Sequence, residues 1–533
     1  MESILIYHYI VTILVSVLFV FKVFVKQNTI LINTRLSCRN LFFNGKLKPM
    51  LPRKMMRLFG FGVCLLILLG CNPFQPKPRS PATDQLPKAY SLYSGQTDSN
   101  QNWWKEFADP ELSQLIQTAL SDNFTLQVAW SRLSQARALA VQAGAERYPD
   151  LTASGDAQVG RLQSSNGSST RSDIETLGLG LYSAYELDLW GRVRAQHETA
   201  LLQTEASRED INTAATTLAA EVANRWIQII AQRMQKDLLE KQLRINETLL
   251  ELVELRFRNA LVSALDVYQQ RQVVENIQAD LPLVEETEQL LLNELAVLLG
   301  KPARTPLTIT RSQLPEPTPL PPTGLPADLL AMRPDVRAAG LRLQAADWQI
   351  AAARANRLPS LSLTAQARYG QSEIDVLFDN WLLSLAANLT APLIDGGFRA
   401  AEVDRTRAVA EENLAFYRNT VLTAVKEVED ALVSETKQRE HIDALRQVNT
   451  TARRALEEAG VRYRNGLNDY LPVLTQLLAA QSLERDLIRA QAGLLTTRVQ
   501  LHRALGGMWP ENFLPPQARP QTHEQDARSL PRS

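Results

Sequence analysis

Three segments of the chain alternate between apolar and polar residues with a period of two. In 177–189 the odd positions read Leu, Leu, Leu, Ser, Tyr, Leu, Leu, and 361–369 and 381–393 follow the same rule; 151–160 follows it more weakly. Each segment has about ten residues, the length that a tilted strand needs to cross a bilayer. One apolar face opposite one polar face is typical of a transmembrane barrel. We therefore predict four strands, at about 148–165, 174–190, 359–371 and 380–394.

A soluble sheet with one face on a core would explain any single segment of this kind equally well. Four such strands cannot close a barrel by themselves, and lipid does not tolerate an open sheet edge. If the strands span a membrane, several chains must therefore share one barrel, although this argument does not give their number. The connecting loops are expected at 165–173 and 371–380.

Long stretches without helix breakers predict unusually long helices. Residues 192–299 contain no Gly and one Pro, Pro282, and 398–459 contain neither. Because Gly and Pro are the usual breakers, and because 65 helical residues extend for about 100 Å, we expect long hairpins. The predicted helices are 192–258, 264–299, 398–463 and 469–505.

Apolar positions within 238–257 form two adjacent stripes on the expected helix. One stripe begins at Leu238 and the other at Leu239, and charged residues cover the remaining surface. Two stripes fit a helix with a neighbour on each side, as in a ring of coiled helices. An ordinary two-helix hairpin is the alternative, but a single stripe would be enough for it.

The chain contains two similar halves. The clearest match joins 255–261 (LRFRNAL) to 461–467 (VRYRNGL), at an offset of 206; two further matches, in the same order, have offsets of 210 and 205. Residues 302–326 between the halves hold eight prolines, so no helix or central strand is expected there. Each half reads as helix, strand, strand, long helix, long helix.

Charge and cysteine content exclude several classes of function. The net charge is zero, which gives no indication of nucleic acid, but residues 1–71 hold nine Lys or Arg and one acid, so the remainder carries −8. A basic excess in an apolar N-terminal region is typical of a targeting segment. The five His are scattered and no CxxC occurs, so we expect no metal site, no cofactor and no His-based catalysis. Paired acids such as Glu285-Glu286 have the spacing of a solvated helix face.

Two apolar runs lie near the N-terminus. Residues 4–25 are about long enough to span a bilayer, whereas the run 58–69 is shorter, follows three basic residues and ends in Leu68-Leu69-Gly70-Cys71. The second run resembles a bacterial lipoprotein signal, which implies that Cys71 is lipidated and becomes the first residue after cleavage. A buried Cys in a transmembrane helix is the alternative, but the Pro-rich tether that follows favours the signal.

The start of translation bears on both runs. Met50, Met55 and Met56 lie just upstream of the signal, so initiation at one of them would make 1–49 a mis-called extension; the rival is a real anchor helix at 4–25. Several acyl chains on Cys71 would suffice for stable anchoring. The next residue is Asn72, not the Asp that resembles an inner-membrane retention signal, which favours the outer membrane.

Together these features resemble a TolC-like outer-membrane factor of the lipidated NodT/OprM type. The residues that carry the resemblance are Leu68–Cys71, Tyr185–Gly191, Arg333–Val336, Pro392–Gly397 and the paired RxRN[A/G]L turns, and it extends over about 100–508. The expected fold is mainly α with a membrane β part: long coiled α-helical hairpins, four transmembrane β-strands per chain in a shared oligomeric barrel, and an internal two-fold repeat.

The resemblance implies a passive exit duct, not an enzyme. Members of the family are homotrimers that pool four strands per chain into a twelve-stranded barrel in the outer-membrane lipid, with a helical tunnel in the periplasm. They serve tripartite efflux or type I secretion, together with a periplasmic adaptor and a proton-driven or ABC inner-membrane transporter. A lipid-anchored periplasmic adaptor or a structural coiled-coil lipoprotein is the alternative, but neither needs four alternating strands.

The two helix turns imply a gate. In the family these turns form the closed periplasmic tip, and Asp266 and Tyr463 match constriction positions. Phe257 and Tyr463 are bulky aromatics that can fill a closing tunnel. Asn468 stands where the best-known members have Arg, and Pro472 where they have an acid, which argues against an inter-hairpin salt bridge. A helix N-cap role is an equal alternative for Asp266.

These arguments divide the chain into seven segments. They are a mis-called extension (1–49), a lipoprotein signal (50–70), a lipidated Pro-rich tether (71–104), the first repeat (105–300), a Pro-rich connector (301–326), the second repeat (327–508) and a flexible tail (509–533).

Overall fold

The computed structural model describes most of the chain after residue 72. The expected extension 1–49, the signal 50–70, Cys71 and the tail 509–533 lie outside the described residues. For 162–164 and 170–174 only the backbone is described. The described residues are 73–77, 79, 86–90, 103–164, 170–317, 319–321, 323–324, 326–371 and 377–507.

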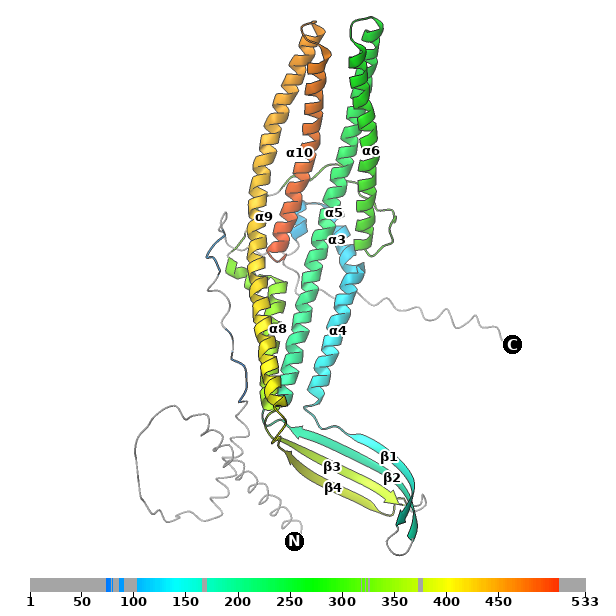
Figure 1. Cartoon of the computed structure of the whole chain (residues 1–533), viewed down its shortest axis with the longest axis vertical. Helices are drawn as coiled ribbons and strands as arrows, with labels where there is room; N and C mark the ends of the chain where they lie inside the picture. Colours follow the sequence, from blue (N-terminus) through cyan, green and yellow to red (C-terminus); the bar gives the residue numbers. More distant parts are fainter. Residues whose placement is uncertain are drawn as a thin grey trace, which may run out of the picture. The chain divides into compact units, whose positions relative to one another are not determined.

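The first repeat consists of short helices, two strands and two long helices (Figure 1). Its elements are η2 (Trp103–Phe107), α3 (Pro110–Asp122), α4 (Phe124–Ala145), β1 (Thr152–Ser164), β2 (Thr170–Leu187), α5 (Arg192–Arg258) and α6 (Ala264–Leu298). Thus β2 begins inside the expected loop 165–173, and it ends at Leu187 because the next residue, Asp188, turns to cap α5.

The second repeat follows the same order. Its elements are η3 (Pro326–Asp328), α7 (Leu329–Met332), α8 (Pro334–Ala355), β3 (Ser360–Gln371), β4 (Trp381–Thr390), α9 (Phe398–Arg464) and α10 (Tyr470–Ala504).

The corresponding helices of the two repeats have equal lengths. Helices α5 and α9 have 67 residues each, α6 and α10 have 35, and α4 and α8 have 22. Since α5 starts at Arg192 and α9 at Phe398, a residue in α5 or α6 corresponds to the residue 206 positions later in α9 or α10. The offset from α4 to α8 is 210. The expected internal two-fold repeat is confirmed.

The two longest helices begin at the same kind of cap. Gly191 and Gly397 precede α5 and α9 with φ of 78° and 88°, a left-handed conformation that Gly adopts at little cost. The Asp188 carboxylate accepts hydrogen bonds from two N–H groups in the first turn of α5, at 3.1 and 2.8 Å. Asp395 accepts from two N–H groups at the start of α9, at 3.1 and 3.2 Å. A carboxylate is favoured at a helix N-terminus, so these caps fix where each strand becomes a helix.

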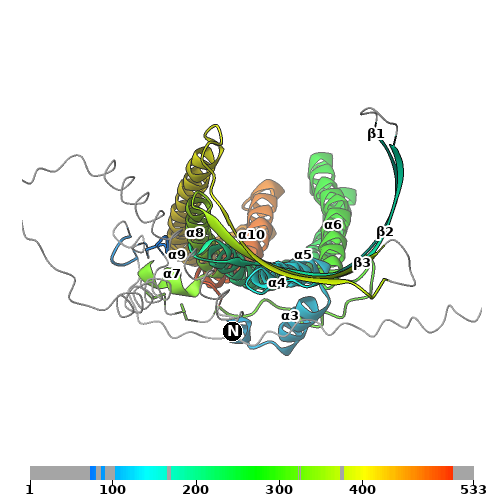
Figure 2. The same ribbon diagram turned by 90° about the horizontal axis from the view of Figure 1, so that it is seen from below.

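The four strands form one antiparallel sheet in the order β1-β2-β3-β4. Figure 2 shows the sheet as a strongly curved ribbon. The pairing of β2 with β3 joins the two repeats. In the described part of the chain, β1 and β4 each pair with one neighbouring strand, and the other edge of each has no partner strand.

The helices pack side by side in a definite order. Helix α5 packs against α4 and α6 of its own repeat and against α8 and α10 of the other, while α9 packs against α8 and α10. Toward the hairpin turns the order is therefore α9, α10, α5, α6, and toward the sheet it is α9, α8, α5, α4 (Figure 1). The largest apolar core lies where α3, α5 and α10 meet, around Trp103, Trp226 and Leu495. Among the described residues, no helix has the length and hydropathy needed to cross a membrane.

Candidate functional site: membrane sheet and tunnel tip

The register of the sheet separates apolar from polar residues. Odd-numbered residues stand opposite odd ones and even opposite even, as when Leu179 pairs with Gly155 and Tyr369. Residues directly opposite each other share a face, so all odd positions lie on one face. The large aliphatic and indole side chains of that face belong to Val159, Leu177, Leu179, Leu181, Leu187, Leu361, Leu363, Trp381, Leu383, Leu385 and Leu389.

The even face carries polar, charged and small residues at most positions. An ion pair lies across three strands of it, with Arg368 of β3 2.7 Å from Asp156 of β1. Gly178 of β2 lies beneath the pair, and a Cβ atom there would come within 2.6 Å of the Asp156 carboxylate. The glycines of β2 thus make room for charged side chains. Because both partners are well exposed, the pair itself contributes little stability.

The odd face is mostly apolar, and much of it is exposed in the single chain. Leu385 is 80% exposed and Leu383 and Trp381 are also exposed. A soluble sheet would bury such a face on a core, whereas lipid would cover it without further protein. The unpaired edges of β1 and β4 need partners in that environment, and other copies of the chain can supply them.

Each helical hairpin reverses at its tip through the same turn. Leu261 N–H donates to the Arg256 carbonyl at 2.9 Å and Ala260 N–H to the Phe257 carbonyl at 2.9 Å, which is the Schellman pattern. Gly466 and Leu467 make the equivalent bonds at 3.1 and 2.9 Å. The left-handed position is Gly466 in one turn, with φ 71°, and Ala260 in the other, with φ 56°. The paired sequence motif therefore encodes one turn geometry used twice.

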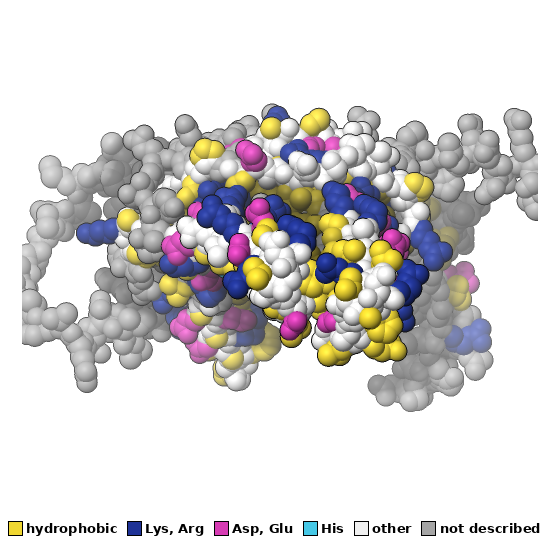
Figure 3. All heavy atoms as spheres, turned by 90° about the horizontal axis from the view of Figure 1, so that it is seen from above, with side chains coloured by type: hydrophobic (Ala, Val, Ile, Leu, Met, Phe, Trp, Pro, Cys, Tyr) yellow, Lys and Arg dark blue, Asp and Glu magenta, His cyan; other side chains and the backbone are white. Residues whose placement is uncertain are grey.

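Arginines gather around both tips. Arg256 and Arg258 lie in the last turn of α5, and Arg462 and Arg464 in the last turn of α9. Figure 3, viewed toward the hairpin ends, shows Lys and Arg side chains over them with apolar side chains in between. Positive charge at a helix C-terminus is favourable, so the arginines stabilise the two helix ends.

Asp266 has a structural role at the start of α6. Its carboxylate accepts a hydrogen bond from Ser263 N–H at 2.9 Å, and Asp266 N–H donates to Ser263 Oγ at 3.3 Å, which completes a capping box. The N-cap residue is therefore Ser263, and Asp266 occupies the third position of the helix. Asp266 is therefore not the N-cap residue itself, although its carboxylate does cap the start of the helix.

Tyr463 lies where the two hairpins meet. Its ring is 5.5 Å from that of Tyr470 and lies under the Arg256 guanidinium at 4.5 Å. Its hydroxyl is buried and has no hydrogen-bond partner among the described residues. Phe257 is half-exposed on α5 and Asn468 is partly buried before α10. Within the described part of the chain, no side-chain hydrogen bond joins any two of the four expected gate residues.

The model of the family described as outer membrane efflux protein matches residues 115–301 and 325–507. These two matches cover both repeats and therefore most of the chain. The chain belongs to the outer membrane efflux protein family. The expected resemblance, fold class and outer-membrane location are confirmed, and the protein is a channel component of efflux across that membrane.

Relatives and solved structures agree with this assignment. The pyoverdine export outer membrane protein OpmQ of Pseudomonas putida is 35% identical over 456 residues, which cover 83% of this chain and 96% of OpmQ. The outer membrane protein OprJ of Pseudomonas aeruginosa is 30% identical over 470 residues, or 86% of this chain and 98% of OprJ. The solved outer-membrane channel OprN superposes with a TM-score of 0.77 at 28% identity, over 82% of this chain and all of OprN.

The Arg333–Val336 motif that this family member carries is a structural joint. Arg333 binds Asp335 and Glu427, each at 2.7 Å, and donates to the Ala504 carbonyl at 3.0 Å. Burial by itself lowers the pKa of Arg333, but the hydrogen bonds and charges of Asp335 and Glu427 raise it overall. Arg333 thus ties the start of α8 to α9 and to the end of α10.

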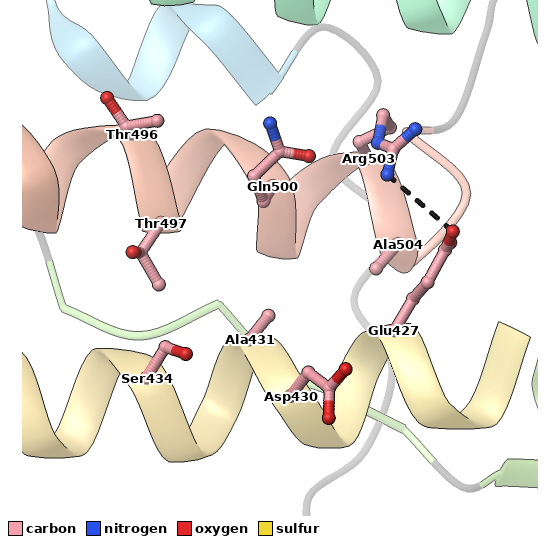
Figure 4. Close-up of a pocket in the computed structure, with 9 residues that line it drawn as sticks. All are labelled: Glu427, Asp430, Ala431, Ser434, Thr496, Thr497, Gln500, Arg503 and Ala504. Carbon is pink, nitrogen blue, oxygen red and sulfur yellow. Dashed lines mark ion pairs between the residues drawn. The ribbon is translucent and has the colours of Figure 1, made fainter. Parts of the chain in front are cut away.

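A cavity of about 270 Å³ lies between α9 and α10 beside this joint (Figure 4). Its charged lining residues are already paired, because Glu427 binds Arg333 and Arg503, and Asp430 binds Lys426. Hydroxyl and amide groups such as Ser434 and Gln500 complete the lining. Ala431 and Ala504 also line the cavity, which therefore combines polar and apolar surface between α9 and α10.

A buried polar cluster near the tip was not predicted from the sequence. We call Gln242, Asn246, Gln270, Tyr470 and Gln481 the polar latch; all five are buried. The Tyr470 hydroxyl donates to Gln270 Oε1 at 2.7 Å. The Gln270 amide donates to the Asn246 backbone carbonyl and to Asn246 Oδ1, at 2.9 and 3.0 Å. Burial raises the pKa of Tyr470, with Tyr463 and Asp266 adding to the shift, so the phenol stays protonated as a donor.

The polar latch joins one hairpin to the other. Gln242 of α5 donates to the Gln481 carbonyl at 3.1 Å, and Asn246 donates to Gln481 Oε1 at 3.2 Å. Arg485 of α10 donates to Gln242 Oε1 at 2.8 Å. The sequence does hold a signal for this cluster, because Gln242 and Asn246 lie three and seven residues after the apolar Leu239 and so interrupt a buried helix face.

Proposed function

We propose that this protein is the outer-membrane exit duct of a tripartite efflux system. Three copies would pool four strands each into a twelve-stranded barrel and extend a helical tunnel into the periplasm. The observation that carries the proposal is the four-stranded sheet, with one mostly apolar face, one mostly polar face and two edges that have no partner strand among the described residues. No catalytic step is required, since a passive duct draws its energy from its partners.

The partners in this proposal are a periplasmic adaptor and an inner-membrane transporter, proton-driven or ABC. The names of the relatives support efflux over type I secretion, because they refer to pyoverdine export, toluene efflux and antibiotic efflux. The adaptor and structural-lipoprotein alternatives are not favoured, since the family match covers both strand-bearing repeats. The genes next to this one would identify the transporter.

The proposed gate consists of Phe257, Asp266, Tyr463 and Asn468 at the tips. Tyr463 gives it the most support, because its buried hydroxyl has no hydrogen-bond partner among the described residues and Arg256 of the other hairpin covers its ring. A hydrogen bond from this hydroxyl to a neighbouring copy would hold the tip closed. Such contacts contribute about 1–3 kcal/mol each when one partner is charged or buried, which an adaptor can overcome.

Conductance of the purified oligomer in planar bilayers tests the duct and its gate together. The wild type should form a water-filled pore of low conductance, and Tyr463→Phe combined with Asp266→Ala should raise that conductance severalfold by loosening the closed tip. Ser263→Ala breaks the same capping box without touching Tyr463, so it separates helix capping from gating. A double mutant that conducts no better than wild type would remove these residues from the gate, and a wild type without any pore would reject the duct.

Lipidation of Cys71 is a separate part of the proposal. The expected mature N-terminus is Cys71 with its thiol and amine acylated, and Cys71→Ser should abolish acylation completely while the sheet can still insert. Mass spectrometry of the N-terminal peptide measures both. An intact peptide spanning Gly70-Cys71-Asn72 in the purified protein would show that the signal is not processed.

A further inference from the structure

A groove of about 360 Å³ runs across the four helices that adjoin the sheet. Helix α5 contributes Ala200, Gln203 and Ser207 to its lining, helix α8 contributes Ala346 and Gln349, and residues of α4 and α9 complete it. We call it the wall groove. Its volume falls within the range of about 300–1,000 Å³ that is typical of small-molecule sites. Neither the proposed gate nor the polar latch accounts for it.

The wall groove lies on the side of these helices that α7 leaves open. Arg337 of α8 donates to the Ala331 carbonyl of α7 at 3.4 Å and binds Glu209 of α5, so both residues mark the side that α7 covers. Ala346 follows Arg337 by nine residues, and Ala200 precedes Glu209 by nine. Because nine residues make about two and a half turns of an α-helix, both alanines lie on the opposite side.

That side faces the interior of the proposed duct. Figure 2 shows α3 and α7 outside the curve of the sheet, so the side opposite α7 is the concave one. A closed barrel encloses its lumen on the concave side of the sheet. The wall groove of each copy would therefore open into the water-filled lumen, where passing molecules reach it.

The lining combines small apolar residues with hydrogen-bonding groups. Ala346 is buried, and its small side chain leaves room above it. The side-chain amides of Gln203 and Gln349 make no hydrogen bond to any other described residue. Arg342, the one charged residue among the described lining, is paired with Asp210 of α5. The wall groove therefore offers apolar contact and hydrogen-bonding amides without net charge.

We propose that the wall groove binds uncharged amphiphilic molecules of about 15–20 non-hydrogen atoms as they pass along the duct. This site deepens the proposed duct, on which it rests, by naming a chemical class of cargo. The apolar body of such a molecule would lie on Ala200 and Ala346, and its polar group would reach Gln203 or Gln349. An anion would have to compete with Asp210 for Arg342, and a cation would find no carboxylate in the described lining.

Protection of a cysteine in the wall groove tests this site on the full-length oligomer in nanodiscs. In a background with Cys38→Ser and Cys64→Ser, Ser207→Cys places a thiol in the groove, and Arg208→Cys places one at an exposed position beside it that does not line the groove. The probe is N-phenyl-1-naphthylamine, an uncharged amphiphile in the proposed size range, and the thiol reagent is a water-soluble sulfonated methanethiosulfonate. At saturating probe, modification of Ser207→Cys should slow about tenfold, because an occupied groove excludes the reagent, whereas Arg208→Cys should react at an unchanged rate.

Two substitutions and a charged analogue make the test specific. Ala200→Phe fills the wall groove and should remove the protection of Ser207→Cys, and Gln349→Ala, which adds no bulk, should weaken it. The anion 1-anilinonaphthalene-8-sulfonate carries the same rings and should protect less than the uncharged probe. Equal protection of both cysteines, or protection that neither substitution changes, would overturn the site. Stronger protection by the anion would overturn the proposed class of ligand.

Conductance of the same oligomer in planar bilayers separates failure of the site from failure of the duct. A conducting oligomer in which the probe does not protect Ser207→Cys would overturn the wall groove alone. An oligomer that forms no pore would reject the duct on which the site rests. Protection that is confined to Ser207→Cys in a conducting oligomer supports both.

Discussion

Replacing Leu385 with Arg is expected to cost about 2–4 kcal/mol of folding free energy in the membrane. Leu385 lies in the middle of β4, on the odd face of the sheet, and it is 80% exposed among the described residues. If that face meets lipid, the guanidinium must enter hydrocarbon near the bilayer midplane, where basic side chains carry this penalty. The measurement is the folded fraction in vesicles as a function of urea, read from the mobility of the unheated oligomer on gels.

Ser384→Arg is the matched control for this prediction. Ser384 is the neighbouring residue in the same strand and lies on the even face, in register with Gln366. That face already accommodates Arg368, so an added Arg would extend into water at little cost. Equal losses at 384 and 385 would show that the lipid-facing side, or the membrane assignment of the sheet, is wrong.

The elements of the fold could be predicted because local signals and tertiary packing agree. The long helices follow from the absence of breakers over 192–299 and 398–459, and the capping glycines Gly191 and Gly397 mark where each long helix begins. The period of two predicts which residues of a strand share a face. The register keeps odd residues opposite odd ones in all three strand pairs, so the prediction holds across the sheet. A two-fold repeat reinforces both predictions, since each half tests the other.

The gate contacts could not be predicted because they depend on which helix faces meet. Asp266 matches a constriction position of the family, but that match does not reveal its contact with Ser263. In the structure the two residues form a capping box at the start of α6. Tyr470 is the first residue of α10, and its burial follows from the approach of α6 and α10. Periodicity gives the face of a helix, but not the residue across from it.

Among substitutions near the tip, the largest loss of stability is expected when the polar latch is broken. Gln270→Leu removes the amide that accepts from Tyr470 and donates to Asn246. The Tyr470 hydroxyl and Asn246 Oδ1 would then be buried without these partners. Since an unsatisfied buried polar group costs about 1–3 kcal/mol, the variant should lose about 2–5 kcal/mol in total. A urea titration of the protein in detergent measures the free energy of unfolding.

The repeat again supplies the control. Gln476 is the counterpart of Gln270 in α10 and is only partly covered, so Gln476→Leu should change stability by less than about 0.5 kcal/mol. Combining Gln270→Leu with Tyr470→Phe should cost less than the sum of the two single losses, because the second change removes a hydroxyl that the first leaves unsatisfied. Strict additivity would mean that Gln270 and Tyr470 do not act together.

The conductance of Gln270→Leu shows whether the polar latch keeps the duct closed or only contributes to stability. The counterparts of Asn246 and Tyr470 in the other repeat are Ala452 and Ala264, so this set of hydrogen bonds occurs once per chain, between its own two hairpins. Within one copy these hydrogen bonds should therefore hold the two hairpins together at this level. Gln270→Leu would let the two hairpins separate, and the conductance of the oligomer should rise with the loss of stability. A destabilised oligomer whose conductance stays at the wild-type level would place the opening of the duct at the seam between copies.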